Sequence, residues 1–246
     1  NWFESQGFPL FLYDNGKQLG SAEALNSAEI VFLCLPTPFD EKTGFSDSAI
    51  WEVLKQIEGE KIVVVKSTVL PGSTDKYQAS FPQHKILFNP EFLTEKNAAD
   101  DFLNPKRQIV GYTEKSKKEA QKVMQLLPKA PFQKIMGAKE AEMVKYFGNL
   151  FLANRVIFAN QMYDVCEKLG IDYDIVKEVA GADERVGKSH FDVFFEGYRG
   201  YYRSCLPKDT KAFIQLAESL GLNPKLMKAV DEINERFIQG NKNYEW

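Results

Sequence analysis

Apolar and polar residues follow one another along the first half of the chain in two different rhythms. Short, continuous apolar runs occupy residues 9–13, 29–35, 61–66, 84–88 and 107–112. A run of this length without polar alternation predicts a strand that is buried on both faces. Between the runs lie amphipathic stretches such as residues 46–58, where Ile50, Val53, Leu54 and Ile57 recur at helical spacing. Alternation of strands and helices predicts an α/β fold with a mostly parallel sheet covered by helices.

The pattern changes after about residue 137. Residues 138–169 contain no proline and a single internal glycine, Gly148. They predict one helix about 45–50 Å long. Further helices are predicted over residues 173–180, 207–220 and 224–238. We therefore predict two domains, an α/β domain over residues 1–137 and an all-helical domain over residues 138–246.

Composition narrows the class of protein. The 246 residues are 44% apolar, which is enough for one large core or two smaller ones. The net charge of −3 gives no basic surface for nucleic acid. No apolar run approaches the roughly 18–20 residues that span a bilayer, so we expect neither nucleic acid nor a membrane as partner. The three cysteines lack metal-type spacing, which argues against a metal site or a disulfide framework and favours a cytoplasmic protein.

Polar loops follow three of the predicted strands. They read Pro-Thr-Pro at 36–38, Lys-Ser-Thr-Val-Leu-Pro-Gly at 66–72 and Asn-Pro-Glu-Phe-Leu-Thr-Glu at 89–95. The carboxyl ends of parallel strands meet at one edge of a sheet, and ligands bind there. Ordinary turn chemistry explains the prolines. It does not explain the carboxylates of Glu91 and Glu95 or the hydroxyls of Ser67 and Thr68, which favour a ligand site.

Cys205 is a candidate nucleophile. It lies just before a predicted helix start, with Lys208 in the first turn. A helix N-terminus and a nearby ammonium both favour the thiolate, which is the attacking species in covalent cysteine chemistry. The alternative is a small buried apolar residue, the interpretation that we give to Cys34 and Cys166 in their apolar surroundings.

Eight motifs occur in a fixed order along nearly the whole chain. They are PTP at 36–38, STVLPG at 67–72, NPEFLTE at 89–95, DFLNPKR at 101–107, AEMVKYFGN at 141–149, FAN at 158–160, DERVG at 183–187 and CLPKD at 205–209. With this set the chain resembles the UDP-glucose/GDP-mannose dehydrogenase family of NAD-dependent nucleotide-sugar dehydrogenases. The resemblance implies a Rossmann-like domain, a helical central domain that forms a homodimer through its long helix, NAD as cofactor and a nucleotide sugar as substrate.

The family's chemistry assigns roles to particular residues. Its members oxidise the C6 alcohol of the sugar to an acid in two hydride transfers to NAD, and by resemblance Cys205 holds the intermediate as a thiohemiacetal and then a thioester. Lys145 and Asn149 would bind the sugar and stabilise negative charge on the reacting oxygen. From spacing alone, the same pair on one helix face could equally be a solvated surface. The remaining catalytic roles implied by the resemblance fall to Asp209, Thr68, Glu91 and Glu95, with the choice of base between the two glutamates left open.

Cofactor and substrate contacts are implied in the same way. Asp14 matches the acidic residue that holds the ribose hydroxyls of NAD, although Asn15-Gly16-Lys17 after it is turn-like and a plain turn aspartate is the alternative. The other cofactor contacts implied are Pro36, Thr37, Thr68, Glu95 and Lys208. The substrate contacts implied are Phe92, Leu93, Lys145, Asn149 and Tyr202.

Three departures from the family pattern leave alternatives open. The chain contains no GxGxxG turn, and because it starts at Asn1 rather than methionine, we expect the first strand of the Rossmann-like domain to be missing. The family's terminal α/β domain is not in this sequence. Tyr202 and Arg203 stand where the family usually has two glycines, which changes the expected sugar pocket. The alternatives are a two-electron dehydrogenase of the hydroxyacid type, which needs no cysteine, and a non-catalytic binding or assembly module.

Overall fold

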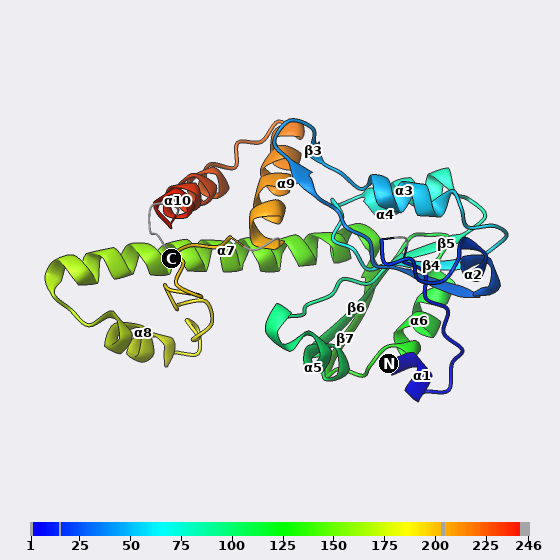
Figure 1. Ribbon diagram of the computed structural model, residues 1–246, viewed down its shortest axis with the longest axis horizontal. Helices are drawn as coiled ribbons and strands as arrows, with labels where there is room; N and C mark the ends of the chain where they lie inside the picture. Colours follow the sequence, from blue (N-terminus) through cyan, green and yellow to red (C-terminus); the bar gives the residue numbers. More distant parts are fainter. Residues whose placement is uncertain (1, 15, 203–204, 242–246) are drawn as a thin grey trace. The chain divides into compact units, whose positions relative to one another are not determined.

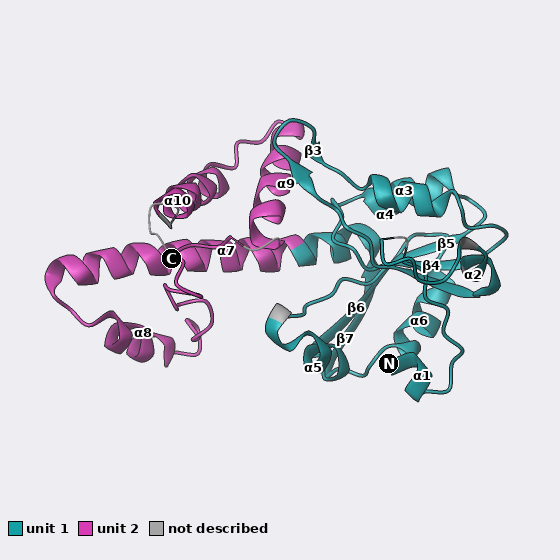
Figure 2. Ribbon diagram, in the orientation of Figure 1, with its two compact units in different colours: residues 1–145 teal, residues 146–246 magenta. Residues whose placement is uncertain are grey.

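The computed structural model describes residues 2–14, 16–202 and 205–241 (Figure 1). The chain forms two compact units, residues 1–145 and 146–246 (Figure 2). The helix predicted over residues 138–169 is confirmed as α7 (Ala138–Leu169), and it contributes residues to both units. The predicted domain boundary after residue 137 stays a prediction.

Unit 1 contains a five-stranded sheet in which four of the five predicted runs form strands. In spatial order the strands are β1 (Ile30–Leu33), β4 (Ile62–Val65), β5 (Lys85–Phe88), β6 (Arg107–Tyr112) and β7 (Phe132–Gly137). Strands β1, β4 and β5 are parallel, with Leu33, Val65 and Phe88 in register at their carboxyl ends. Strand β6 runs antiparallel to β5 and parallel to β7. The mostly parallel sheet is therefore confirmed, and three strands end at the same edge.

The strand predicted over residues 9–13 is wrong. Residues 9–13 have no regular structure, and Asp14 pairs with Leu19 across a short turn. The side chains of Phe11 and Leu12 are about half exposed, so this run has no buried face against which a strand could pack. Strand β7 and the small hairpin of β2 (Phe39–Asp40) and β3 (Gly44–Phe45) were not predicted from the sequence. Exposed residues open β7, and the hairpin strands are only two residues long.

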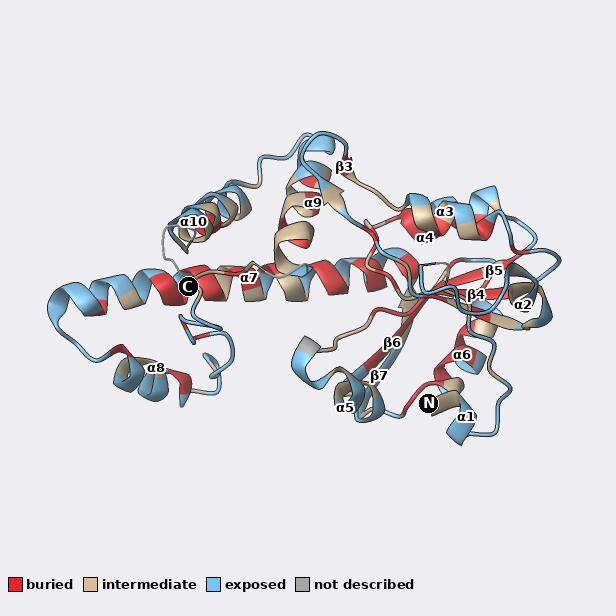
Figure 3. Cartoon of the chain, viewed as in Figure 1, coloured by how far each residue is buried: buried red, intermediate tan, exposed pale blue. Residues whose placement is uncertain are grey.

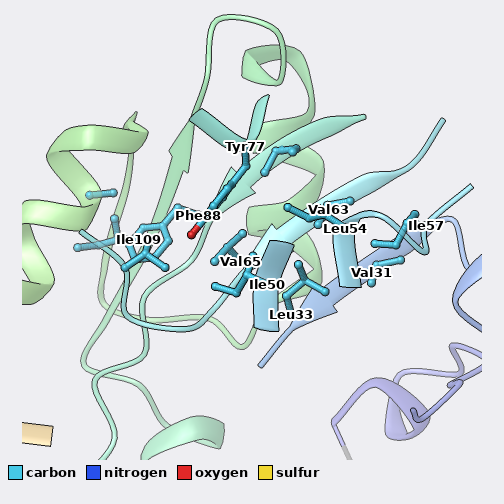
Figure 4. Close-up of a cluster of buried hydrophobic side chains, with 13 residues drawn as sticks. Val31, Leu33, Ile50, Leu54, Ile57, Val63, Val65, Tyr77, Phe88 and Ile109 are labelled. Carbon is cyan, nitrogen blue, oxygen red and sulfur yellow. The ribbon is translucent and has the colours of Figure 1, made fainter. Parts of the chain in front are cut away.

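Two apolar clusters cover opposite faces of the sheet. Along β4, Val63 and Val65 belong to one cluster, whereas Ile62 and Val64 belong to the other, as the alternation of side chains along a strand requires. Helix α3 (Ser48–Leu54) supplies Ile50 and Leu54 to the first cluster (Figure 4). Helix α6 (Ala120–Leu126) contributes Val123 to the second. Figure 3 shows β4, β5 and β6 as largely buried strands.

Helix α4 (Ser73–Ser80) also belongs to unit 1. Gly72 precedes it with a φ of +95°, a left-handed conformation that favours glycine. The remaining elements are α1 (Trp2–Ser5), α2 (Ala22–Ser27), η1 (Glu95–Asn97), α5 (Ala98–Leu103) and η2 (Lys117–Glu119). The first turns of α7 lie so close to β6 that a Cβ at Gly111 would be 2.8 Å from the Cβ of Ala141. A glycine at this position lets the helix approach the strand.

Among the described residues, unit 2 combines the rest of α7 with α8 (Tyr173–Gly181), α9 (Cys205–Ser219) and α10 (Lys225–Asn241). Two side chains form hydrogen bonds that hold residues 199–201, which precede α9, against α7 and α10. Arg199 donates to the Asn160 side chain on α7 at 3.0 Å, and Asn234 of α10 exchanges two hydrogen bonds with the backbone of Tyr201. Within the described ranges, no helix is both long enough and apolar enough to cross a membrane.

Candidate active site

The loops after β1 and β4 are joined at the shared edge of the sheet. The backbone N–H of Leu35 donates to Oγ of Ser67 at 2.8 Å, and Oγ1 of Thr37 donates to the carbonyl of Thr68 at 2.8 Å. Two of the predicted cofactor contacts, Thr37 and Thr68, are thus brought together, and the exposed Pro36 lies between the joined residues. This is the edge at which parallel sheets bind their ligands.

The loop after β5 places Glu91 beside Lys145. Nζ of Lys145 donates to the backbone carbonyl of Glu91 at 2.8 Å and to its Oε1 at 3.2 Å. The Lys145 side chain is only 7% exposed, and the second oxygen of Glu91 accepts a hydrogen bond from Leu93 N–H at 2.8 Å. The ring of Phe92 lies 5.8 Å from the ammonium. A buried ammonium beside a carboxylate suits both proton transfer and stabilisation of a developing negative charge.

A buried hydrogen-bond chain next to this pair was missed from the sequence. Nζ of Lys66 donates to Oδ1 of Asn89 at 2.6 Å, and the amide of Asn89 donates to Gln108 at 3.1 Å and to the carbonyl of Ile109 at 2.7 Å. Burial lowers the pKa of Lys66, against the opposing effects of the Cys34 thiol and of Glu91. The available signal was position, because Lys66 and Asn89 directly follow buried apolar strands.

A cavity of about 250 Å³ opens beside these groups within unit 1. Its wall includes three of the predicted residues, Glu91, Phe92 and Leu93, together with Lys66. Arg107, another residue that the sequence reasoning did not nominate, lies with its guanidinium 3.8 Å from the centre of the Phe92 ring. The other lining residues are Pro90, Asp101, Phe102, Asn104, Pro105, Lys106 and Gln108. The cavity therefore offers charges of both signs and an aromatic face to a polar ligand.

A second group of predicted residues comes together in unit 2. Asp209 on α9 is 1% exposed, and its carboxylate accepts hydrogen bonds from Nδ2 of Asn149 on α7 and from Nζ of Lys208, each at 2.5 Å. Cys205 is the first residue of α9 and is exposed. It precedes Asp209 by four residues, so both lie on the same side of the helix. Arg203 and Ser204 lie outside the described residues.

Three other predicted residues have individual outcomes. Asp14 does not lie at a strand end; its carboxylate accepts from Lys17 N–H at 3.0 Å, as a turn aspartate does. Tyr202 donates to Glu196 at 2.8 Å. The side chain of Glu95 lies outside the described part of the chain, although its backbone belongs to η1.

Of the two cysteines predicted to be buried, one is buried and the other is exposed. Cys166 is buried, as predicted. The interpretation of Cys34 as a buried apolar residue is wrong, because β1 ends at Leu33 and Cys34 is exposed just beyond it.

A mostly parallel sheet with polar loops at the carboxyl ends of its strands defines a Rossmann-like dinucleotide-binding class of protein. Two family models match the chain. The NAD binding domain of the UDP-glucose/GDP-mannose dehydrogenase family matches residues 16–127, and the central domain of the same family matches residues 139–236. The chain belongs to this family, and its cofactor is NAD.

Individual relatives agree with this assignment. The chain is 35% identical to a UDP-glucose 6-dehydrogenase of Pseudomonas aeruginosa, over 87% of this chain and 50% of the relative. It is also 35% identical to UDP-glucose 6-dehydrogenase TuaD of Bacillus subtilis, over 87% of this chain and 48% of that protein. A solved UDP-glucose dehydrogenase from Pyrobaculum islandicum superposes with a TM-score of 0.78 at 32% identity, over 87% of this chain and 52% of that one. The chain thus spans about half the length of the relatives it matches.

Proposed function

We propose that the protein containing this chain is an NAD-dependent nucleotide-sugar 6-dehydrogenase that oxidises a primary alcohol to a carboxylic acid through a covalent intermediate on Cys205. The observation that carries the proposal is the composition of α9 and its surroundings. An exposed thiol begins the helix, and a buried carboxylate held by an ammonium and an amide follows within four residues. In a chain of this family, these groups match the requirements of cysteine-dependent oxidation.

The reaction consists of two oxidations at one carbon. NAD supplies the two-electron acceptor for each of them. In the first, the alcohol loses its hydroxyl proton to a base and a hydride from C6, which leaves an aldehyde. The Cys205 thiolate adds to the aldehyde, forming a C–S bond and a thiohemiacetal. Loss of a second hydride and a proton gives a thioester, and water then cleaves the C–S bond to release the acid and the thiol.

Each half of the described chain supports part of this chemistry. In unit 1, the ammonium of Lys145 stabilises negative charge on the reacting oxygen, and Glu91, whose carboxylate contacts that ammonium, is available as base. In unit 2, Asn149 and Lys208 orient the carboxylate of Asp209, which organises the hydrolytic water. Thr68, in unit 1, is proposed to hold a catalytic water. These roles are our assignments to positions that match the family's motifs.

The proposed ligand contacts rest on the same motifs. Thr37, Thr68 and Pro36, at the carboxyl edge of the sheet, suit the hydroxyl-rich ribose and nicotinamide portions of NAD, and the edge is where such cofactors bind. Asp14, Glu95 and Lys208 remain proposed cofactor contacts. Phe92 and Leu93, which line the cavity of unit 1, and Tyr202 remain proposed substrate contacts.

We also propose that the protein is a cytoplasmic homodimer assembled through α7. An apolar stripe supports this proposal. Phe147, Phe151, Phe158, Met162, Val165 and Leu169 recur at intervals of three, four and seven residues, and each is between 37% and 73% exposed. Such spacing places all six on one side of the helix. An exposed apolar surface of this kind is typical of a protein–protein interface.

The test of the proposed function uses the protein of natural length with NAD and a panel of UDP- and GDP-sugars. NADH formation on at least one sugar, with a uronic acid as product, supports the dehydrogenase. Cys205→Ala should abolish acid formation, whereas the matched thiol control Cys166→Ala should retain it. NADH formation at the normal rate in Cys205→Ala, with one NADH for each sugar and the aldehyde as product, would favour the two-electron hydroxyacid-type alternative. NADH formation on none of the sugars would favour the non-catalytic module.

A further inference from the structure

Glu142 is a completely buried carboxylate that the proposed chemistry does not use. It lies in the first turns of α7, and both of its oxygens accept hydrogen bonds from the start of α4. The backbone N–H of Gly72 donates to Oε2. Thr74 donates twice to Oε1, through its backbone N–H at 2.8 Å and through its hydroxyl at 2.6 Å. All of these groups belong to unit 1.

A carboxylate at this place costs stability. Burial raises the pKa of Glu142 to about 7, and the three hydrogen bonds oppose that rise without cancelling it. The other charged and titratable groups facing it are Asp75 and Tyr77 on α4 and Lys139 on α7, which pairs with Asp75 at 3.9 Å. An uncharged side chain would avoid the cost of burying the charge. A role in stability alone therefore does not account for the carboxylate.

The position of Glu142 on α7 indicates what it does instead. Lys145 follows three residues later, on the neighbouring turn and the same side of the helix. Its ammonium is held against the carbonyl and the carboxylate of Glu91. Two glycines help to fix α7 in this place. Gly111 has no side chain, which lets α7 approach β6, and Gly72 has a left-handed backbone conformation from which its N–H donates to Glu142. A rotation or a shift of α7 at Glu142 would move Lys145 as well.

We propose that Glu142 is a positioning residue, which fixes the rotation and depth of α7 against the N-terminus of α4 and so holds the Lys145 ammonium against Glu91. The catalytic consequence of this inference rests on the proposed function. The placement of Lys145 does not, since it is a property of the folded chain alone.

Two nearly isosteric variants test the proposal. Glu142→Gln replaces one accepting oxygen by a donor, so at least one of the three donors from α4 loses its acceptor. Thr74→Val removes only the hydroxyl donor and serves as the test if Glu142→Gln does not fold. Glu140→Gln is the matched control, because Glu140 is exposed on the same helix.

The first readout is the rate of reductive methylation of Lys145, followed by mass spectrometry and normalised to the exposed Lys228. It should rise several-fold in Glu142→Gln, less in Thr74→Val and not at all in Glu140→Gln. This readout needs no enzyme activity, so it decides the positioning even if no nucleotide sugar is oxidised and the proposed function fails. An unchanged rate in both test variants would overturn the proposal.

The second readout is turnover. Because misplacing a catalytic group by about 1 Å costs up to about 100-fold, Glu142→Gln should lower kcat at least about 10-fold while changing the KM for NAD little. Thr74→Val should move the acidic limb of the kcat profile to higher pH, because it removes a hydrogen bond that lowers the pKa of Glu142. A purely structural role predicts no such shift, so wild-type pH profiles in both variants would contradict the positioning role.

Discussion

Asp209 lies between Lys208 and Asn149 with almost no access to solvent, and its charge is held by both neighbours. Asp209→Asn keeps the shape but removes the charge, which leaves the Lys208 ammonium facing an amide. We expect turnover to fall by about 100-fold, the loss typical of removing one well-placed polar group from an active site. Steady-state rates of NADH formation measure this. The exposed Asp192→Asn is the control, and equal rates in the two variants would contradict a role for Asp209.

Glu142 predicts a particular dependence of stability on pH. Its pKa rises from an ordinary value of 4.5 to about 7 in the folded chain, so the folded state holds the proton more tightly than the unfolded state. This contribution to stability is complete below pH 4.5 and is lost as the pH rises through about 7. The free energy of unfolding should therefore fall by about 3 kcal/mol across this range relative to Glu142→Gln. Urea denaturation at several pH values measures the difference, and parallel curves for the two proteins would refute the raised pKa.

Individual site residues were predictable to different degrees. Glu91, Lys145, Asn149 and Asp209 stand in local motifs, and the structure gives each of them a partner from the same predicted set. Glu142 was not nominated, although it lies within one of the motifs. Its partners are about 70 residues away in the sequence. No local pattern reveals a contact that forms only when α7 packs against α4.

At the scale of elements, the contact between α7 and β6 depends on Gly111. An added Cβ would lie 2.8 Å from the Cβ of Ala141 and 2.9 Å from the Cα of Ala138, and neither atom can move away without moving the helix. Gly111→Ala should therefore destabilise the chain by about 1–3 kcal/mol, as overpacking of a core does. Gly240→Ala on α10, where nothing lies within 4 Å, should be neutral or stabilising. Urea denaturation of both variants checks this, and a neutral Gly111→Ala would show that α7 is not closely packed there.

Elements that depend only on local pattern were predictable. The apolar run at residues 61–66 contains strand β4, and the proline-free stretch at residues 138–169 forms helix α7, as predicted. The direction of β6 was not predictable, because a strand buried on both faces has the same apolar run whether it pairs parallel or antiparallel. For residues 9–13 the local pattern was misleading. The run is apolar enough for a strand, but in the folded chain it pairs with no strand and forms no regular structure.

At the scale of the whole molecule, the exposed stripe on α7 predicts an oligomer. The protein should sediment as a dimer at micromolar concentration. Phe158→Glu places a charge in the middle of the stripe and should shift the equilibrium to monomer, because an unpaired charge is costly to bury in an interface. Leu226→Glu, at an exposed apolar residue of α10, is the matched control and should leave the dimer intact. A wild-type protein that sediments as a monomer would contradict the proposed interface.

Covalent retention of the aldehyde is the central claim, and the most direct test of it counts electrons. The protein of natural length is incubated with excess NAD and a limiting amount of the nucleotide sugar that it oxidises, and the NADH formed is divided by the sugar consumed. A mechanism that holds the aldehyde on Cys205 predicts two NADH for each sugar, with the acid as sole product. A ratio of one, with the aldehyde released, would contradict it.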